Sequence, residues 1–332
     1  MNSDRKSAVH SNGIPVLSSV EPQFALPGGE IRIVGQGLMP KPERPLVHIG
    51  QDPASILFGS NTLMVARIPE EATGGPLTVE TALGTSAPAD VRVAVPIAEN
   101  LHPVANPAVD EDGNIFATFS GSRGQAVPVS IFRVDANFNV HPFLTGLMNA
   151  TGLALDIENN LYVSSRNDGT VYKVSPAGEL STYAQGMGVA TGIAFDAEGN
   201  LYVGDRSGTI FKIARDREIF VLATLEPSVA AYHLAFSPNG NLYVTGPTTS
   251  SNDAIYEIDP HGDVTVYYRG LGRPQGLAFD TDGSLYVVAS YKGRRGVVRF
   301  TAAGEPSLVV SGNALVGLSF APDGAMVLAT TT

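Results

Sequence analysis

The clearest pattern along the chain is a phrase of apolar and polar positions that returns several times. In Thr191–Ile213 an apolar run is followed by an acidic turn with Gly-Asn, a second apolar run ending in Tyr-Val, a polar loop and a third, alternating run. Short apolar runs bounded by Asp, Gly and Asn are typical of β-strands joined by tight turns. The phrase and the segment after it predict four strands, at Gly192–Phe195, Leu201–Val203, Thr209–Ile213 and Glu218–Ala223.

Copies of this phrase follow one another at a period of about 40 residues, which is typical of propeller blades. A small residue in the first apolar run marks the copies: Ala108, Ala154, Ala194, Ala235, Ala278 and Ser319. A four-stranded unit at that period predicts a β-propeller, with six blades over residues 96–332. The sixth copy ends after two strands, so we expect the segment around Val91–Leu101 to complete that blade. This closure would hold the first part of the chain rigidly against the edge of the propeller.

Residues 14–95 have a different pattern, of short alternating runs separated by breaks rich in Pro and Gly. The runs are Glu30–Val34, Leu46–Ile49, Thr62–Ile68, Pro76–Glu80 and Val91–Val95. Strands of this length and spacing predict a small antiparallel sandwich of the immunoglobulin type. Residues 1–13 are polar and have no period, which predicts a disordered tail. The predicted fold class is therefore all-β: an immunoglobulin-like β-sandwich followed by a six-bladed β-propeller.

Composition supports a folded all-β chain and narrows its partners. The 332 residues are 43% hydrophobic and include 36 Gly and 23 Pro, in keeping with many strands and tight turns. A net charge of −11 argues against nucleic-acid binding, which needs a basic surface. The absence of cysteine excludes disulfides and thiolate zinc sites.

The sequence also carries a localisation prediction. No apolar run approaches the length of a membrane span, and the first 20 residues lack the apolar core of a signal peptide. As given, the chain is expected to be cytoplasmic. It would be extracellular or periplasmic if a leader was removed.

The repeat phrase resembles six-bladed propellers of the NHL-repeat and SMP-30/gluconolactonase-like superfamily. The matching residues in the third copy are Gly192–Asp196, Gly199–Val203 and Gly208–Lys212, and the resemblance spans residues 96–332. It implies the architecture more directly than an activity, because this fold hosts lactonases, lyases and pure binding scaffolds.

The first part of the chain resembles the IPT/TIG family, which has an immunoglobulin-like fold. The resemblance rests on Pro27-Gly28-Gly29, Ile31–Ile33 and Gly35-Gln36-Gly37, followed by strand-like segments up to Gly84–Ser86. It implies a spacer or an interaction domain. One hypothesis that follows is a structural protein that assembles with itself through this domain.

The propeller resemblance implies a metal-dependent lactonase as one candidate function. Lactonases of the superfamily hold a divalent metal with Glu, Asn and Asp placed just before the inner strands, because a hard cation takes oxygen ligands. The corresponding positions here are Ala105, Thr151, Thr191, Tyr232, Gln275 and Val316. None is a carboxylate, so no cofactor is predicted. Calcium or zinc belongs only to the lactonase alternative, for which Asn106 and Asn149 are the nearest candidate ligands.

Two further groups of residues have a chemical and a structural interpretation. His233 replaces the usual Gly at the inner edge of blade four, either as a filler of the channel or as a tunable acid or base. The acidic turns, such as Asp156 with Glu158 and Asp196 with Glu198, are interpreted as structural, because Asp there bonds its own turn. Asp205, in the loop after the second strand of blade three, has no such clear structural role.

Charges divide unequally between the two faces of the predicted propeller. Loops between the second and third strands carry the basic residues Arg123, Arg166, Arg206, Lys292, Arg294 and Arg295, and their only acidic residues are Asp168, Asp205 and Asp253. The hairpin turns of the opposite face collect most of the acidic residues. The longest loops, Gly121–Val129 and Pro247–Asp253, are expected to form a rim. This asymmetry favours an anionic partner at the loop face.

The leading hypothesis is a non-catalytic binding or scaffold protein that uses the loop face of the propeller. Its partner is expected to be a protein or a small anionic or carbohydrate ligand. The alternatives are the lactonase-like hydrolase with an atypical site and the self-assembling structural protein. The candidate ligand-binding residues are Thr151, Arg166, Thr191, Asp205, Arg206, Tyr232, His233 and Gln275.

Overall fold

The computed structural model describes residues 13–41, 43–119, 121, 125–249 and 253–331. The expected tail and Arg123 lie outside these residues, apart from Gly13. The described residues contain strands, turns and irregular segments but no helix. The chain divides into two compact units, residues 1–95 with Leu308–Asn313, and residues 96–307 with 314–332.

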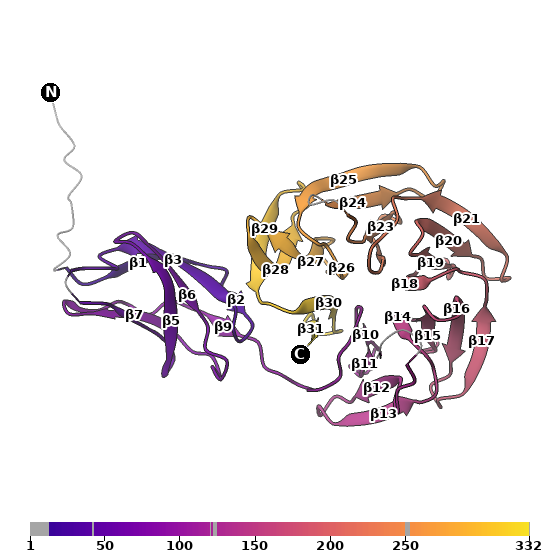
Figure 1. Ribbon diagram of the computed structural model, residues 1–332, viewed down its shortest axis with the longest axis horizontal. Coiled ribbons are helices and arrows are strands. Elements are labelled where there is room, and N and C mark those ends of the chain that lie inside the picture. Colours follow the sequence, from indigo (N-terminus) through magenta and orange to yellow (C-terminus); the bar gives the residue numbers. More distant parts are fainter. Residues whose placement is uncertain (1–12, 42, 120, 122–124, 250–252, 332) are drawn as a thin grey trace. The chain divides into compact units, whose positions relative to one another are not determined.

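The first unit is a β-sandwich (Figure 1). Its strands are β1 (Val16–Glu21), β2 (Phe24–Ala25), β3 (Glu30–Gln36), β4 (Leu46–Ile49), β5 (Asp52–Gly59), β6 (Leu63–Arg67), β7 (Leu77–Thr81), β8 (Gly84–Thr85) and β9 (Arg92–Val93). The strand order is β1-β3-β6-β5-β4-β7-β8, and β2 pairs in parallel with β9 and with Val310 and Ser311.

Alternation along the sandwich strands builds its core. In β3 the side chains of Ile31 and Ile33 are fully buried, and Ile49, Met64 and Leu77 join them from β4, β6 and β7. The expected strand Leu46–Ile49 matches β4, and the other expected runs overlap β3, β6, β7 and β9.

The second unit is the six-bladed propeller, whose strands circle a central axis in Figure 1. Blades one and two are β10 (Ala108–Val109), β11 (Ile115–Thr118), β12 (Ile131–Val134), β13 (Val140–Leu144), β14 (Ala150–Leu155), β15 (Leu161–Ser165), β16 (Thr170–Val174) and β17 (Leu180–Ala184). Blades three and four are β18 (Ala190–Phe195), β19 (Leu201–Asp205), β20 (Thr209–Ile213), β21 (Ile219–Thr224), β22 (His233–Phe236), β23 (Leu242–Thr245), β24 (Asp253–Ile258) and β25 (Val264–Leu271). The last strands are β26 (Leu277–Phe279), β27 (Leu285–Tyr291), β28 (Arg294–Phe300), β29 (Pro306–Ser311), β30 (Leu315–Phe320) and β31 (Met326–Thr330); the part of β29 from Leu308 onwards is assigned to the first unit.

Packing between neighbouring blades explains the Tyr of the repeat phrase. Tyr162 on the second strand of blade two meets Phe195 on the first strand of blade three, with ring centroids 4.8 Å apart and planes at 81°. The pairs Tyr202–Phe236, Tyr243–Phe279 and Tyr286–Phe320 repeat this edge-to-face contact at later blade junctions. Such pairs add to the stabilisation that comes from burying the rings. The repeat phrase therefore encodes the contact between blades as well as the strands within them.

The expected closure of blade six by a strand is wrong in one respect. Residues 96–101 form no strand, and blade six is a two-stranded sheet of β30 and β31 in the part of the chain that the structure describes. Pro96 has no amide hydrogen to donate, and positive φ angles of 61° at Asn100 and 46° at His102 interrupt an extended backbone. Ile97 and Leu101 nevertheless line a small cavity together with Val327 of β31.

Candidate ligand-binding site

A cavity of about 280 Å³ lies where the loops after the second strands meet the segments that lead into the inner strands. We name it the loop-face cavity. Six of the eight predicted site residues line it, namely Thr151, Arg166, Thr191, Arg206, His233 and Gln275. Its other lining residues are largely apolar and include Val189, Val229 and Val316.

Arg166 and Arg206 occupy the same position in adjacent blades, immediately after β15 and β19. The backbone N–H of Arg206 donates to the carbonyl of Val189, and that of Arg166 to the carbonyl of Asn149, so the inner strand of each blade fixes the place of its arginine. Arg166 Nη2 donates to Gly121 O at 3.1 Å, and Arg206 Nε donates to Ser228 O at 3.3 Å. Among the described residues, no carboxylate lines the cavity.

Tyr232 and Asp205 do not line the loop-face cavity. The Tyr232 phenol is 1% exposed and donates to the carbonyl of Glu226, and burial raises its pKa. The Asp205 carboxylate accepts from the backbone N–H of Val189 at 2.8 Å and from the Ser207 hydroxyl. Both side chains are thus hydrogen-bonded to neighbouring protein groups and do not face the cavity. Sequence reasoning placed them at the mouth because their neighbours in the repeat, Thr191 and Arg206, are there.

The threonines and Gln275 are held by hydrogen bonds that limit what each can offer a ligand. Thr191 Oγ1 donates to Gly204 O and accepts from Tyr232 N–H, so both of its roles are filled. Thr151 Oγ1 donates to Asn149 O at 3.0 Å and keeps acceptor capacity. The carbonyl oxygen of the Gln275 side chain accepts from Arg295, which leaves the amide –NH₂ as its remaining donor.

The basic residues of blade five play a supporting part. Arg294 and Arg295 begin β28, so they do not lie in a loop as the sequence suggested. The Arg295 guanidinium donates to the carbonyls of Arg273 and Leu315 as well as to Gln275. Burial, with the nearby charge of Arg273, lowers the pKa of Arg295 to about 10. Arg295 therefore positions Gln275 beside the cavity.

Sequence reasoning placed Val316 at the channel but missed the rest of the apolar lining. Pro103, Val189 and Ala230 line the loop-face cavity, and each lies two places before the channel position of its blade. A repeat alignment extended by two residues would have found this register.

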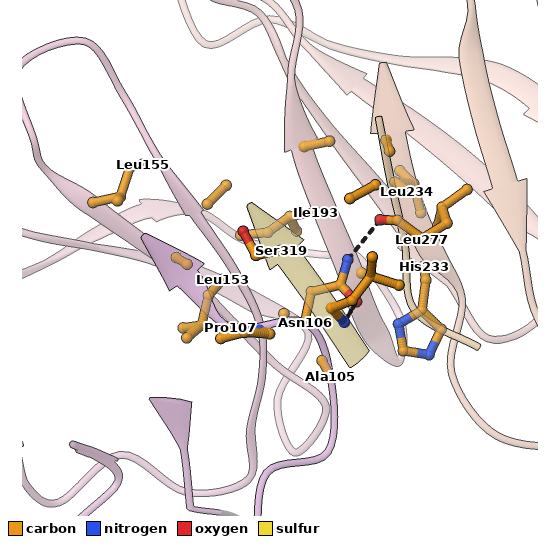
Figure 2. A pocket seen from close by; sticks show the side chains of 18 of the residues that line it. Ala105, Asn106, Pro107, Leu153, Leu155, Ile193, His233, Leu234, Leu277 and Ser319 are labelled. Atoms are coloured by element: carbon orange, nitrogen blue, oxygen red, sulfur yellow. Dashed lines mark hydrogen bonds between the residues drawn. The ribbon is translucent and has the colours of Figure 1, made fainter. Parts of the chain in front are cut away.

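A second cavity of about 350 Å³, the channel cavity, lies between the inner strands (Figure 2). Its wall is largely apolar, with Leu153, Ile193 and Leu277 among its residues. Asn106 lines it too, but its amide is committed to the backbone: Nδ2 donates to Leu277 O at 2.8 Å and Oδ1 accepts from Leu318 N–H at 3.2 Å. His233 lines both the channel cavity and the loop-face cavity.

The residues present do not fit a hard divalent cation. No group of three or more His, Asp or Glu side chains placed to bind a metal occurs within the residues described. Of the alternative ligands, Asn106 is already used, because its Oδ1 accepts from Leu318 N–H, and Asn149 would contribute a single neutral amide oxygen. A hard cation needs several oxygen ligands, usually with carboxylates among them. We therefore derive no step through a metal.

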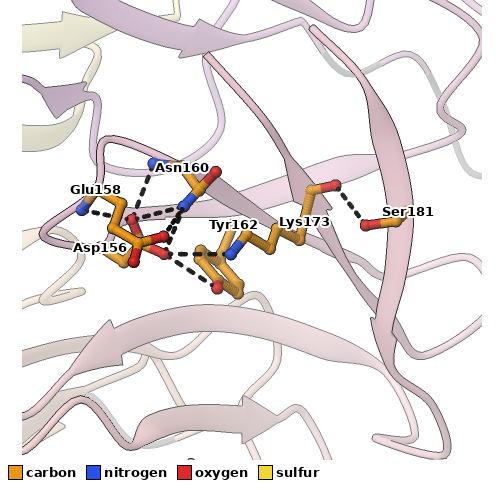
Figure 3. Close-up of polar contacts among 6 residues, drawn as sticks. All are labelled: Asp156, Glu158, Asn160, Tyr162, Lys173 and Ser181. Carbon is orange, nitrogen blue, oxygen red and sulfur yellow. Dashed lines mark hydrogen bonds and ion pairs between the residues drawn. The ribbon is translucent and has the colours of Figure 1, made fainter. Parts of the chain in front are cut away.

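The acidic turns are structural, as expected. Figure 3 shows the Asp156 carboxylate in the first hairpin of blade two, where it accepts from the backbone N–H groups of Glu158 and Asn160, each at 2.9 Å. It also accepts from the Tyr162 hydroxyl at 3.1 Å. Burial alone would raise the pKa of Asp156, but the hydrogen bonds from Asn160, Glu158 and Tyr162 outweigh it and lower that pKa. Equivalent bonds occur at Asp110, Asp196 and Asp280.

Comparison with known proteins agrees with this architecture. The family model described as SMP-30/Gluconolactonase/LRE-like region matches residues 155–330, which is more than half of the chain. The chain belongs to the SMP-30/gluconolactonase/LRE-like family. Residues 15–92 match the IPT/TIG domain. A search of curated proteins gives no match.

Several solved structures share the fold of this protein over nearly the whole length of its chain. An auxiliary nutrient binding protein from Bacteroides thetaiotaomicron is 11% identical with a TM-score of 0.54, over 96% of this chain and 95% of that chain. One from Bacteroides ovatus is 13% identical with a TM-score of 0.53, over 96% of each chain. Virginiamycin B lyase from Staphylococcus aureus is 12% identical with a TM-score of 0.52, over 97% of this chain and 93% of that chain.

These identities show likeness of fold alone.

Across the described part of the chain, no helix has the length and apolar character that a membrane crossing requires.

Proposed function

We propose that this protein is a binding protein whose loop-face cavity takes a small anionic ligand. The observation that carries the proposal is the pairing of Arg166 and Arg206 in a wall where the described lining residues include no carboxylate. The net charge of the whole chain is −11, so this local excess of positive charge is not a consequence of composition. Guanidinium groups bind carboxylates and phosphates through charge-assisted, often bidentate hydrogen bonds.

The setting of Arg166 strengthens its attraction for an anion, whereas Arg206 is exposed. Arg166 is half-buried, and the apolar side chains of Val189, Val229 and Val316 share the cavity wall. Charges interact more strongly where low-dielectric walls replace water. A volume of about 280 Å³ suits a molecule of monosaccharide size and is too small for a protein loop of several residues. A small ligand is therefore favoured over a protein partner at this place.

The solved relatives support a binding role. The two Bacteroides structures, described as auxiliary nutrient binding proteins, share the fold over 96% of this chain. A carboxylate-bearing nutrient of monosaccharide size agrees with both the cavity and that description.

Calorimetric titration with D-glucuronate tests the proposal. Each of Arg166→Ala and Arg206→Ala is expected to weaken binding by about tenfold or more, because a hydrogen bond between charged groups is lost. The control is Arg67→Ala, which removes the same charge from a surface ion pair with Glu30 in the sandwich unit. D-glucose, which has no carboxylate, is expected to bind far more weakly than D-glucuronate. Equal affinities for wild type and the two cavity variants would contradict the proposal.

Lactone hydrolysis is the second candidate, and family membership favours it. The purified protein would then contain a stoichiometric divalent metal and would lose lactone hydrolysis on chelation. Because the described residues do not supply the ligands of a hard cation, we expect no stoichiometric metal, and glucuronate binding that is unchanged by chelation.

A further inference from the structure

One position, near the start of each inner strand, recurs in all six blades. It is Gly in four of the blades, at Gly152, Gly192, Gly276 and Gly317. The two departures are Asn106 in blade one and His233 in blade four, which are opposite one another in a ring of six.

Close approach between blades explains the glycines. A Cβ at Gly152 would lie 2.3 Å from Thr191 O, and one at Gly192 would lie 2.4 Å from Tyr232 O. At Gly317 the nearest atom would be Ala105 O, at 2.5 Å. These distances are shorter than any real contact of a Cβ atom, so these blades exclude a side chain. Side chains enter the channel at this level from blades one and four.

The two departures differ in what their side chains do. The Asn106 amide is hydrogen-bonded to the backbone of blades five and six, as described above. His233 is 3% exposed and no described residue gives its ring a hydrogen bond, but the ring nitrogens are not among the fully buried atoms that lack a partner, so they open onto the cavities that His233 lines. A buried polar group normally has a hydrogen-bond partner, because leaving it without one costs free energy. The partner of this imidazole is therefore expected to be a molecule in one of the two cavities that it lines.

The loop-face cavity supplies the setting for that partner. Its lining combines His233 with the –NH₂ of Gln275, the acceptor capacity of Thr151 and the guanidinium groups of Arg166 and Arg206. A neutral imidazole has one donor and one acceptor nitrogen, which matches a hydroxyl group that both accepts and donates.

We propose that His233 is the specificity-determining residue of this cavity, where it hydrogen-bonds a hydroxyl of the anion held by Arg166 and Arg206 and so selects hydroxy acids over plain carboxylates. This inference rests on the proposed function. A site built to hydrogen-bond a hydroxyl disfavours an analogue that lacks it, because its buried polar groups are then left without partners.

The test compares two carboxylates on six-membered rings, D-glucuronate and cyclohexanecarboxylate, by calorimetric titration of the full chain. Wild type is expected to prefer glucuronate by at least about tenfold. His233→Gly introduces the residue that four other blades carry, and it is expected to reduce this preference to about twofold by weakening glucuronate alone. His233→Asn, the residue of blade one, is expected to keep part of the preference, because an amide also donates and accepts.

The outcomes separate this inference from the proposed function. If His233→Gly leaves the glucuronate preference intact, or weakens both acids equally, His233 does not determine specificity. The proposed function survives that result as long as Arg166→Ala still weakens both acids. If neither acid binds the wild type, both proposals are wrong. Matching thermal unfolding of wild type and both His233 variants is the control for folding.

Discussion

The loop face and the hairpin face of the propeller are built from the same blades, yet they use charged residues in different ways. On the hairpin face the Asp carboxylates recur from blade to blade and accept hydrogen bonds from their own turns, as Asp156 and Asp196 do. On the loop face Arg166 and Arg206 occur in two blades and line a cavity whose described lining residues include no carboxylate. The Asp residues of the hairpin face thus belong to the repeat, whereas Arg166 and Arg206 are particular to blades two and three.

Repeated positions are explained by the blade itself, and so is Asn106 through its bonds to blades five and six, whereas His233 is not. Gly192 and Asp196 each satisfy a local need, for close approach or for a turn. His233 satisfies no such need, since a Gly serves at the same place in four blades. We therefore expect changes at repeated positions to alter stability and changes at His233 to alter binding.

The largest effect is expected for Gly192→Ala. The new Cβ would lie 2.4 Å from Tyr232 O and 2.9 Å from His233 Cα, and these backbone atoms cannot move aside as a flexible side chain can. We expect a loss of about 4 kcal/mol in the free energy of unfolding, measured by urea denaturation. The matched control is His233→Ala at the equivalent position of blade four, which is expected to cost much less. Similar losses for the two variants would show that blade three tolerates a side chain at this position as well as blade four does.

The second effect concerns the pH dependence of stability at His233. Burial lowers the pKa of His233 from its ordinary 6.5 to about 4, so the unfolded chain binds a proton in this range that the folded chain does not. Stability that is fully present above pH 6.5 is therefore lost as the pH falls towards 4, by about 3 kcal/mol from this group. In His233→Asn the fall between pH 7 and pH 4 should be smaller than in wild type by that amount. Parallel curves would contradict a buried, neutral imidazole.

A smaller loss of stability is expected for Asp196→Ala. The carboxylate accepts from Asn200 N–H at 2.8 Å, from Asn200 Nδ2 at 2.7 Å and from the Tyr202 hydroxyl at 3.1 Å. Removing it leaves the buried Tyr202 hydroxyl without that acceptor, at a cost of about 2 kcal/mol in the free energy of unfolding. Glu198→Ala removes the same charge from an exposed place in the same turn and should cost little. Glucuronate affinity should be unchanged in both variants; a selective loss in Asp196→Ala would tie the hairpin face to binding.

The repeated features could be predicted from sequence, because each copy of the phrase shows the same local chemistry. The strand expected at Thr209–Ile213 is β20, and the structural role of the acidic turns is confirmed. The sandwich strand β5 (Asp52–Gly59) was missed. It contains Pro53, and a bulge between Ile56 and Phe58 disturbs the alternation of its buried and exposed positions.

The candidate site was predicted only in part, because a repeat alignment gives the positions of residues but not the directions of their side chains. A repeat alignment identifies which residues stand near the channel, and this was enough to place Arg166, Arg206 and His233 at the cavity. It does not tell which way a side chain turns. Tyr232 turns to the carbonyl of Glu226, and Asp205 supports the backbone of Val189, because partners distant in sequence are available there. Such choices depend on neighbouring blades, which a single copy of the repeat does not encode.

The most direct test of the central claim is a crystal structure with D-glucuronate bound. The account predicts the sugar acid in the loop-face cavity, with its carboxylate against Arg166 and Arg206 and a hydroxyl within hydrogen-bond distance of a His233 ring nitrogen. A ligand bound only on the hairpin face, or one whose carboxylate lies away from both arginines, would contradict it.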